Sequence, residues 1–423
     1  MENKGVSSCK KTLINPKETV IPKECILLNR SFLFLWLSST FSFLALSTYL
    51  FAEQWYIIRV LKQEAVLGIV LMVTMIPRIL LMTIGGVWAD RIKRSRIMLF
   101  SSLARCVLVL MMILFLQLNW LQIWPLICFA VFFGCVDAFF SPANSSLLPI
   151  VVSKNLLTRA NSFIQSSNQI AMFSGPMIGG LILTFGASFN ILFLIVAIFL
   201  VITFIFSSFI REEQQEIHNN QKNSTKLELK EGFKYVWNMP FLKNMIIILI
   251  IINFFFFGPL TIGIPLLVNN VLLGEAIDLS ILQGSYEIGM LLGALVIGLL
   301  NLTKRKGLII LILISLIGVA LATLGQINTV WQGVILLLLM GIFSSVINVL
   351  LISSIQEKSH EDKIGRVMSI VNASSNGLVP LSYAFVSLSL FINLSISVLM
   401  LFCGILILMI SILYIFKSKM IMD

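Results

Sequence analysis

Charged side chains are scarce in this chain of 423 residues, and their scarcity excludes a water-soluble fold. Only 12% of the residues are Asp, Glu, Lys or Arg, about half the share of a typical globular protein, whereas 58% are hydrophobic and 32 are Phe. So few polar side chains cannot cover the surface of a soluble fold of this size. The chain is therefore expected to lie in a membrane.

The sequence also lacks the patterns of metal sites, disulfide frameworks and ATP-driven pumps. Its six cysteines have no C-x-x-C spacing, and His218 and His360 stand alone in polar segments. We therefore expect no disulfide, metal site or cofactor. No G-x-x-x-x-G-K-[ST] motif occurs, which argues against an ATP-driven pump. The polar first 30 residues contain no apolar segment followed by small residues, so no removable signal peptide is expected.

Apolar runs long enough to cross about 30 Å of hydrocarbon recur along the whole chain. We predict twelve transmembrane helices: 32–57, 65–88, 97–117, 121–146, 161–184, 190–210, 243–268, 279–302, 307–326, 330–353, 367–391 and 392–416. The longest polar stretch, 211–243, divides these helices six and six.

The basic residues lie almost entirely on one side of these predicted helices. When the connecting segments are assigned alternately to two sides, 26 of the 30 basic residues fall on the side of the N-terminal tail, whereas only Arg59 and Lys62 fall on the other. The positive-inside rule then places both termini in the cytoplasm, and the expected location is the bacterial cytoplasmic membrane. Because this orientation accounts for the formal charge of +11, nucleic-acid binding is not expected.

The two halves of the chain contain matching segments. L-T-R-A-N-S-F, with Arg159, and I-G-R-V-M-S-I, with Arg366, stand 207 residues apart, and Asp90 precedes Asn301 by 211. Parallel repeats of six helices are a common plan of secondary transporters. We therefore predict an all-α integral membrane protein with twelve transmembrane helices in two pseudo-symmetric six-helix bundles around a central cavity.

This division gives five segments. They are a cytoplasmic N-terminal tail (1–30), an N-terminal bundle (31–210), a cytoplasmic central loop (211–242), a C-terminal bundle (243–416) and a cytoplasmic C-terminal tail (417–423). Within the central loop, Thr225 to Trp237 has apolar residues at helical spacing. An amphipathic helix on the inner membrane surface is expected there.

Two short motifs carry the strongest local signals. The segment after the second predicted helix reads G-G-V-W-A-D-R-I-K-R-S-R, and the fifth predicted helix contains G-P-M-I-G-G. Small residues let helices approach closely, a proline bends a helix, and an acid at a helix end pairs with a nearby base. A plain basic loop and ordinary helix packing are the alternatives. The residues concerned are Gly85, Gly86, Asp90, Arg91 and Arg94 in the first motif and Gly175, Pro176, Gly179 and Gly180 in the second.

On these motifs the chain resembles the major facilitator superfamily. The first motif is similar to the superfamily's signature between helices two and three, and the second to a motif of its antiporters. The segments 139–152, 157–162, 167–180 and 355–369, and the surroundings of Glu231-Gly232, resemble the branch that holds macrolide efflux proteins and the enterobactin exporter. The likeness extends from about residue 32 to 391.

The resemblance implies a gate on the cytoplasmic side. Asp90 and the arginines after it, Arg91 and Arg94, would couple the second helix to the start of the eleventh, near Arg366. The chain differs from many drug antiporters of the superfamily at a position that serves proton coupling. Those antiporters carry an arginine in the fourth helix, whereas the only charged residue of this chain in that predicted helix is Asp137.

Five ionisable residues fall inside the predicted helices, where each should face a partner or water. Arg105 and Asp137 lie at a similar depth, about 12–14 Å from the inner end of their helices, so we predict a structural ion pair. Helices one and eight face the central cavity in this superfamily, so Glu53 and Glu287 would carry protons or meet a cationic substrate. The alternative is that they reach outer water. Arg78 would neutralise one of them or bind an anionic group.

The function expected from these features is proton-coupled export of a lipophilic small molecule, such as a macrolide-like drug. The transporter is expected to work as a monomer, with protons, its substrate and membrane lipids as its partners. One alternative is a dedicated exporter of an endogenous siderophore or peptide antibiotic. Another is a lysophospholipid transporter, which would need a lateral opening. A membrane scaffold without transport activity would leave Glu287 and the gating motif unexplained. No enzymatic activity is expected.

Overall fold

The computed structural model describes residues 29–212, 234–300, 305–360 and 363–417, and every regular element in those ranges is a helix. The N-terminal half contains α1 (Arg30–Arg59), η2 (Glu64–Val66), α2 (Leu67–Arg91), α3 (Arg94–Gln117), α4 (Ile123–Val151), η3 (Lys154–Leu156), α5 (Leu157–Thr184) and α6 (Phe189–Ser208). The C-terminal half contains α8 (Pro240–Asn270), α9 (Ala276–Leu300), α10 (Lys306–Leu324), α11 (Val330–Lys358), α12 (Ile364–Gly377), α13 (Val379–Phe391) and α14 (Ile396–Lys417).

These helices form twelve membrane spans. Within the described residues, ten helices are long and apolar enough to cross a bilayer on their own. α5 is as long as these but more polar, because its first turns contain Arg159, Asn161 and Ser162. α12 and α13 together make the remaining span, which is interrupted at Leu378 because Pro380 has no N–H to continue the helical ladder.

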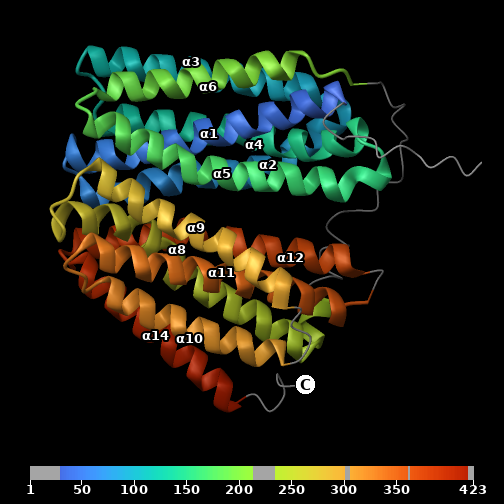
Figure 1. Cartoon of the computed structure of the whole chain (residues 1–423), viewed down its shortest axis with the longest axis vertical. Coiled ribbons are helices and arrows are strands. Elements are labelled where there is room, and N and C mark those ends of the chain that lie inside the picture. The colour runs from blue at the N-terminus through green and yellow to red at the C-terminus, as the bar shows by residue number, and fades with distance from the viewer. Residues whose placement is uncertain (1–28, 213–233, 301–304, 361–362, 418–423) are drawn as a thin grey trace, which may run out of the picture.

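The helices pack into two bundles that repeat one another (Figure 1). In the first bundle, α1 packs on α5 and α6, α2 on α4, and α3 on α4 and α6. In the second bundle, α8 packs on α13 and α14, α9 on α11, and α10 on α11 and α14. The pairings correspond one to one when each helix is matched with its counterpart six spans later. The pseudo-symmetry predicted from sequence is thus present in the packing.

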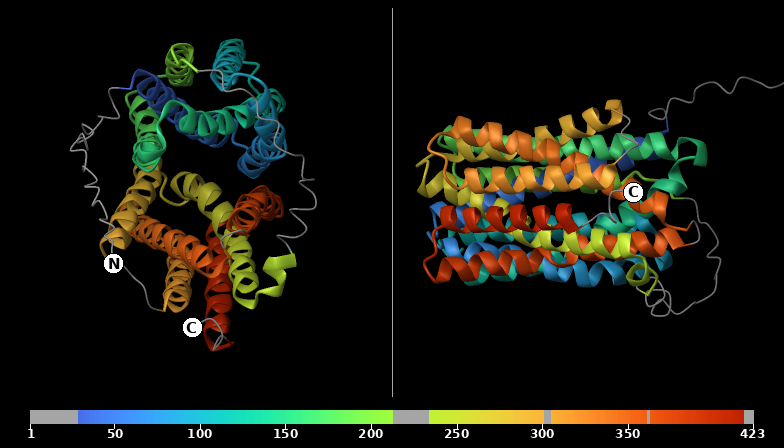
Figure 2. Two further views of the ribbon diagram at one scale, coloured as in Figure 1. Left: turned by 90° about the vertical axis from the view of Figure 1, so that its right-hand side faces the viewer. Right: turned by 90° about the horizontal axis from the view of Figure 1, so that it is seen from below.

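The axes of all twelve spans are roughly aligned and successive spans alternate in direction, so the connecting segments lie at two ends of the molecule. We call the end that holds the start of α1 and the end of α14 the basic end, and it faces the viewer in the left panel of Figure 2. We call the end that holds the turns 60–63, 118–122, 185–188, 271–275, 325–329 and 392–395 the opposite end. In Figure 1 the bundles lie close together at the opposite end and further apart at the basic end.

Close backbone contacts join the bundles at the opposite end. A Cβ atom on Gly180 in α5 would lie 2.8 Å from the carbonyl oxygen of Ala276 in α9, and one on Gly68 in α2 would lie 2.4 Å from that of Tyr383 in α13. Only glycine permits such an approach. Polar contacts accompany these glycines: both oxygens of Glu64 accept hydrogen bonds from Asn269 and Asn270.

The amphipathic helix predicted for Thr225 to Trp237 lies mostly outside the described residues. Lys234 to Asn238 is helical. Within it, the hydroxyl of Tyr235 accepts a hydrogen bond from the backbone of His360 at 3.2 Å. The tails 1–28 and 418–423 also lie outside the described residues.

Candidate functional site

The acid in α9 joins the two bundles about halfway along the molecule. Glu287 is partly buried, and its Oε2 accepts a hydrogen bond from the side-chain amide of Gln169 in α5. Because α5 and α9 belong to different bundles, this hydrogen bond crosses the surface along which the bundles would move. An amide donor can serve an ionised carboxylate or the carbonyl oxygen of a protonated one, so the contact is compatible with both states.

Two arginines share one carboxylate in the N-terminal bundle. Nη1 of Arg105 lies 2.9 Å from Oδ1 of Asp137, and Nε of Arg78 lies 3.1 Å from Oδ2. Arg105 is fully buried, donates to the hydroxyl of Ser42 at 3.0 Å and lies over the ring of Phe140. The pair expected between Arg105 and Asp137 is in contact, and Arg78 joins it as a third member.

Arg78 presents the excess charge of this cluster. The three charges sum to +1, and the side chain of Arg78 is 36% exposed, whereas those of Asp137 and Arg105 are 7% and 1% exposed. Among the described residues, Arg78 has no other ion-pair partner. The suggestion that Arg78 neutralises Glu53 or Glu287 therefore does not fit the structure, in which Asp137 takes that place.

Arg78 and Glu287 occupy equivalent places in the two repeats. Arg78 follows the first residue of α2 by 11 positions, and Glu287 follows the first residue of α9 by 11. Both side chains therefore lie about 16 Å from the opposite-end start of their helices. The sequence offset between them, 209, falls within the range of the other matched positions. One repeat thus places a cation, and the other an acid, at the same depth.

The helix that carries Arg78 meets the second bundle. α2 packs along α13, and the backbone carbonyl of Tyr383 in α13 contacts α2 at Gly68. Neither Tyr383 nor Gln169 was expected from the sequence, because a lone neutral polar residue in an apolar helix gives no local signal.

Glu53 lies away from the bundle interface. Its side chain is fully buried, and its Oε1 accepts a hydrogen bond from the hydroxyl of Tyr49, one turn earlier in α1, at 2.8 Å. The ring of Tyr49 stacks on Phe133 of α4 and contacts Phe193 of α6, which puts this face of α1 inside the N-terminal bundle. The expectation that Glu53 faces a central cavity or outer water therefore does not match the structure. Within the part of the chain that the structure describes, its Oε2 has no hydrogen-bond partner.

The gating motif is described only in part. A Cβ atom on Gly85 would lie 3.0 Å from the carbonyl oxygen of Ala138, so Gly85 lets α2 pack closely on α4, whereas a Cβ atom on Gly86 would have no described atom within 4 Å. The side chains of Asp90, Arg91 and Arg366 lie outside the described residues.

Arg94, the last motif residue, anchors the start of α3. It lies 3.3 Å from Glu212, which follows α6, and donates to Ser146 in α4 at 3.2 Å. Glu212 also accepts from the backbone and side chain of Ser95, so its carboxylate satisfies free N–H groups at the helix start. The second repeat has a related arrangement, in which Lys306 at the start of α10 contacts Ser353 and Glu357, but here both partners lie in α11.

The motif of α5 packs helices within and between bundles. Cβ atoms on Gly175 and Gly179 would overlap Ser47 and Phe51 of α1, so these two glycines hold α5 on α1. Gly180 instead contacts α9 of the other bundle. Pro176, between them, is buried inside the helix. The motif is therefore part of the seal at the opposite end as well as of the N-terminal bundle.

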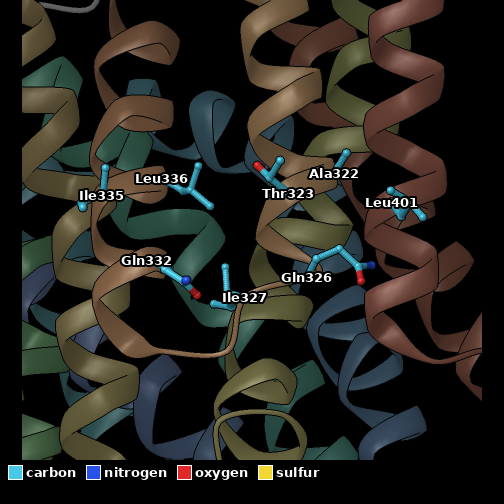
Figure 3. Close-up of a pocket in the computed structure, with 8 residues that line it drawn as sticks. All are labelled: Ala322, Thr323, Gln326, Ile327, Gln332, Ile335, Leu336 and Leu401. Carbon is cyan, nitrogen blue, oxygen red and sulfur yellow. The ribbon is translucent and has the colours of Figure 1, made fainter.

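A pocket of about 540 Å³ lies at the opposite end between α10, α11 and α14 (Figure 3). Aliphatic side chains line it together with Thr323, Gln326 and Gln332. The amide oxygen of Gln332 accepts from the backbone N–H groups of Asn328 and Thr329 and so caps α11. Because the pocket belongs to one bundle and none of the intramembrane charges lines it, it is separate from the site at the interface.

The family model of the Major Facilitator Superfamily matches this chain over residues 35–381 and 260–420. The chain belongs to the Major Facilitator Superfamily. It is a transporter rather than an enzyme, and its many apolar helices make it a multi-pass membrane protein.

Its relatives include named exporters. The chain is 26% identical over 314 residues to the MFS-type transporter YfmI of Bacillus subtilis, which covers 72% of this chain and 76% of YfmI. It is 23% identical over 304 residues to macrolide efflux protein A of Streptococcus pyogenes, which covers 70% of this chain and 73% of that protein. It is 25% identical over 299 residues to the enterobactin exporter EntS of Escherichia coli, with 69% of each chain covered. The predicted branch is thereby confirmed.

A solved structure shares the fold. The crystal structure of the nucleoside transporter NupG superposes with a TM-score of 0.74 over 92% of this chain and 99% of that one, at 13% identity. At that identity the likeness concerns the fold alone.

Proposed function

We propose that this transporter exports a lipophilic small molecule, such as a macrolide-like drug, across the cytoplasmic membrane in exchange for protons, by alternating access. The hydrogen bond between Gln169 and Glu287 carries the proposal. It ties the partly buried acid Glu287, at mid-depth, to the opposite bundle. Protonation of Glu287 keeps this hydrogen bond but weakens it, because an ionised carboxylate is the stronger acceptor. The relation to macrolide efflux protein A and the enterobactin exporter supports the direction of transport.

In this proposal the basic end is cytoplasmic, both termini are inside and the transporter works as a monomer. Among the described residues, the side-chain hydrogen bonds between bundles all involve the opposite end or the Gln169–Glu287 contact; one of them joins Gln54 to Gln283 at 3.0 Å. This pattern fits a state closed towards the outside. Asp90, Arg91 and Arg366 close the cytoplasmic side in the alternate state, with residues 31–210 and 243–416 moving as the two bundles.

The test is proton flux in proteoliposomes that contain the full chain. Addition of erythromycin should drive proton movement, and Glu287→Gln should abolish that movement, because an amide cannot take up or release a proton at this position. Glu275→Gln is the matched control, since Glu275 is exposed at the start of α9 and should leave the flux unchanged. Unchanged proton flux in Glu287→Gln contradicts the proposal.

Glu53→Gln distinguishes the two candidate acids. Glu53 contacts Tyr49 of its own helix and no described residue of the C-terminal bundle, so drug-driven proton flux should persist in this variant. Loss of flux in Glu53→Gln together with normal flux in Glu287→Gln would assign coupling to Glu53. In cells, drug accumulation measured with and without a protonophore should differ for the wild type, and equal accumulation would exclude proton exchange.

A further inference from the structure

We propose that the molecule carried by this transporter bears an acidic group, a carboxylate or a phosphate, that binds at Arg78 of α2. The proposal rests on the export function proposed above, but gives the lipophilic substrate an acidic group in place of the basic amino group that a macrolide carries. The site belongs to the cluster of Arg78, Asp137 and Arg105.

The cluster carries one positive charge that no carboxylate within it balances. One carboxylate, Asp137, faces two guanidinium groups, and charges within a membrane require partners or water. The excess positive charge therefore favours an anion beside the cluster. It also disfavours a cationic group at the same place, because like charges repel more strongly where water is scarce.

The exposed member of the cluster has the right donors for an oxyanion. Arg105 is enclosed by Asp137, Ser42 and the ring of Phe140, so it is committed to the bundle interior. Arg78 uses its Nε towards Asp137, so its two Nη groups, with their four N–H donors, have no ion-pair partner among the described residues, and the side chain is 36% exposed. A planar guanidinium of this kind binds carboxylate or phosphate through two parallel hydrogen bonds.

Arg78 places the site at the interface of the two bundles. Its helix, α2, packs on α13 of the C-terminal bundle. An anion bound to Arg78 at this interface would be enclosed in one arrangement of the bundles and exposed in the other. Glu287, at the depth of Arg78 but on α9, remains available for the proton in this scheme.

The probes for the test are three pyrene compounds that share one apolar body: pyrenebutanoate, its methyl ester and pyrenebutylamine. The midpoint of thermal unfolding of the purified full chain in detergent micelles is measured against the concentration of each. The acid should stabilise the wild type at concentrations about tenfold lower than the ester does, because only the acid forms charge-assisted hydrogen bonds. The amine should stabilise it least.

The variants identify the residue responsible. Arg78→Gln should remove the advantage of the acid, and Arg78→Lys should retain part of it as a point charge without the planar fork. Arg159→Gln, an exposed arginine at the basic end, should behave as the wild type. Arg78→Gln leaves Arg105 and Asp137 as a neutral pair, so it should fold. If it does not, Arg78→Lys carries the test through a reduced preference for the acid.

An acid that stabilises the wild type no better than its ester, whether both bind or neither does, overturns the proposal. So does an undiminished preference in Arg78→Gln. These measurements are independent of proton flux. Normal drug-driven proton flux without a preference for the acid would disprove the acidic substrate and leave the proposed transport function standing. Absence of proton flux in the wild type with both erythromycin and pyrenebutanoate, together with a clear acid preference, removes the proton-coupled transport function and leaves the anion site.

Discussion

At the scale of single residues, Asp137 controls the stability of the N-terminal bundle. Asp137→Asn would leave Arg78 and Arg105 without a carboxylate, and Arg105 is fully buried. We expect a loss of about 3–5 kcal/mol in the free energy of unfolding, the usual cost of breaking a buried pair by removing one partner. Thermal unfolding in detergent micelles measures this loss. Arg78→Gln is the comparison variant, and equal destabilisation by both would contradict the assignment of Arg105–Asp137 as the structural pair.

Residue-level prediction succeeded where depth along a helix decides a contact. Arg105 and Asp137 lie at one depth on neighbouring helices, so their pairing could be predicted from the sequence. The place of Glu53 could not be predicted, because the direction in which a side chain points around α1 depends on how α1 is rotated against α4 and α6. Neutral partners such as Gln169 and Tyr383 are set by packing between helices distant in sequence.

At the scale of helices, Gly180 lets α5 and α9 close the opposite end. A Cβ atom there would lie 2.4 Å from the hydroxyl of Ser280 and 2.8 Å from the backbone of α9, so a larger side chain must force these helices apart. We expect Gly180→Val to shift the population towards a state open at the opposite end. Spin-label distances between positions 62 and 273 should then lengthen. Gly298→Val is the control, because no atom lies within 4 Å of a Cβ atom there, and unchanged distances in Gly180→Val would contradict the seal.

The helices themselves were largely predictable from hydropathy. Apolar runs predict twelve spans whose ends differ from the observed helices by a few residues, because a run of about 20 apolar residues must cross the membrane as a helix. The break between α12 and α13 was not predicted, since hydropathy does not register the missing N–H of Pro380. The contact of Glu212 with the start of α3 was not predicted, because Glu212 follows α6 and is distant from α3 in the sequence.

At the scale of the whole molecule, the distribution of basic residues predicts its orientation. Single cysteines at Lys62 and Leu273, both exposed at the opposite end, should react with a membrane-impermeant maleimide in intact cells of a variant that lacks the native cysteines. A cysteine at Arg96, exposed at the basic end, should react only after permeabilisation. The reverse pattern would contradict the positive-inside orientation.

Transport by two rigid bundles predicts that the place of a crosslink, rather than its presence, decides activity. Gln54 and Gln283 contact each other across the bundles at 3.0 Å, whereas the hydroxyls of Ser38 and Ser207 lie 2.7 Å apart within the N-terminal bundle. Oxidation of a cysteine pair at 54 and 283 should stop export, and a reductant should restore it, because the opposite end can no longer open. Oxidation of a pair at 38 and 207 should leave export intact, since both positions move together. Drug accumulation before and after reduction measures both effects, and continued export by the oxidised 54–283 pair would show that the bundles do not separate at the opposite end.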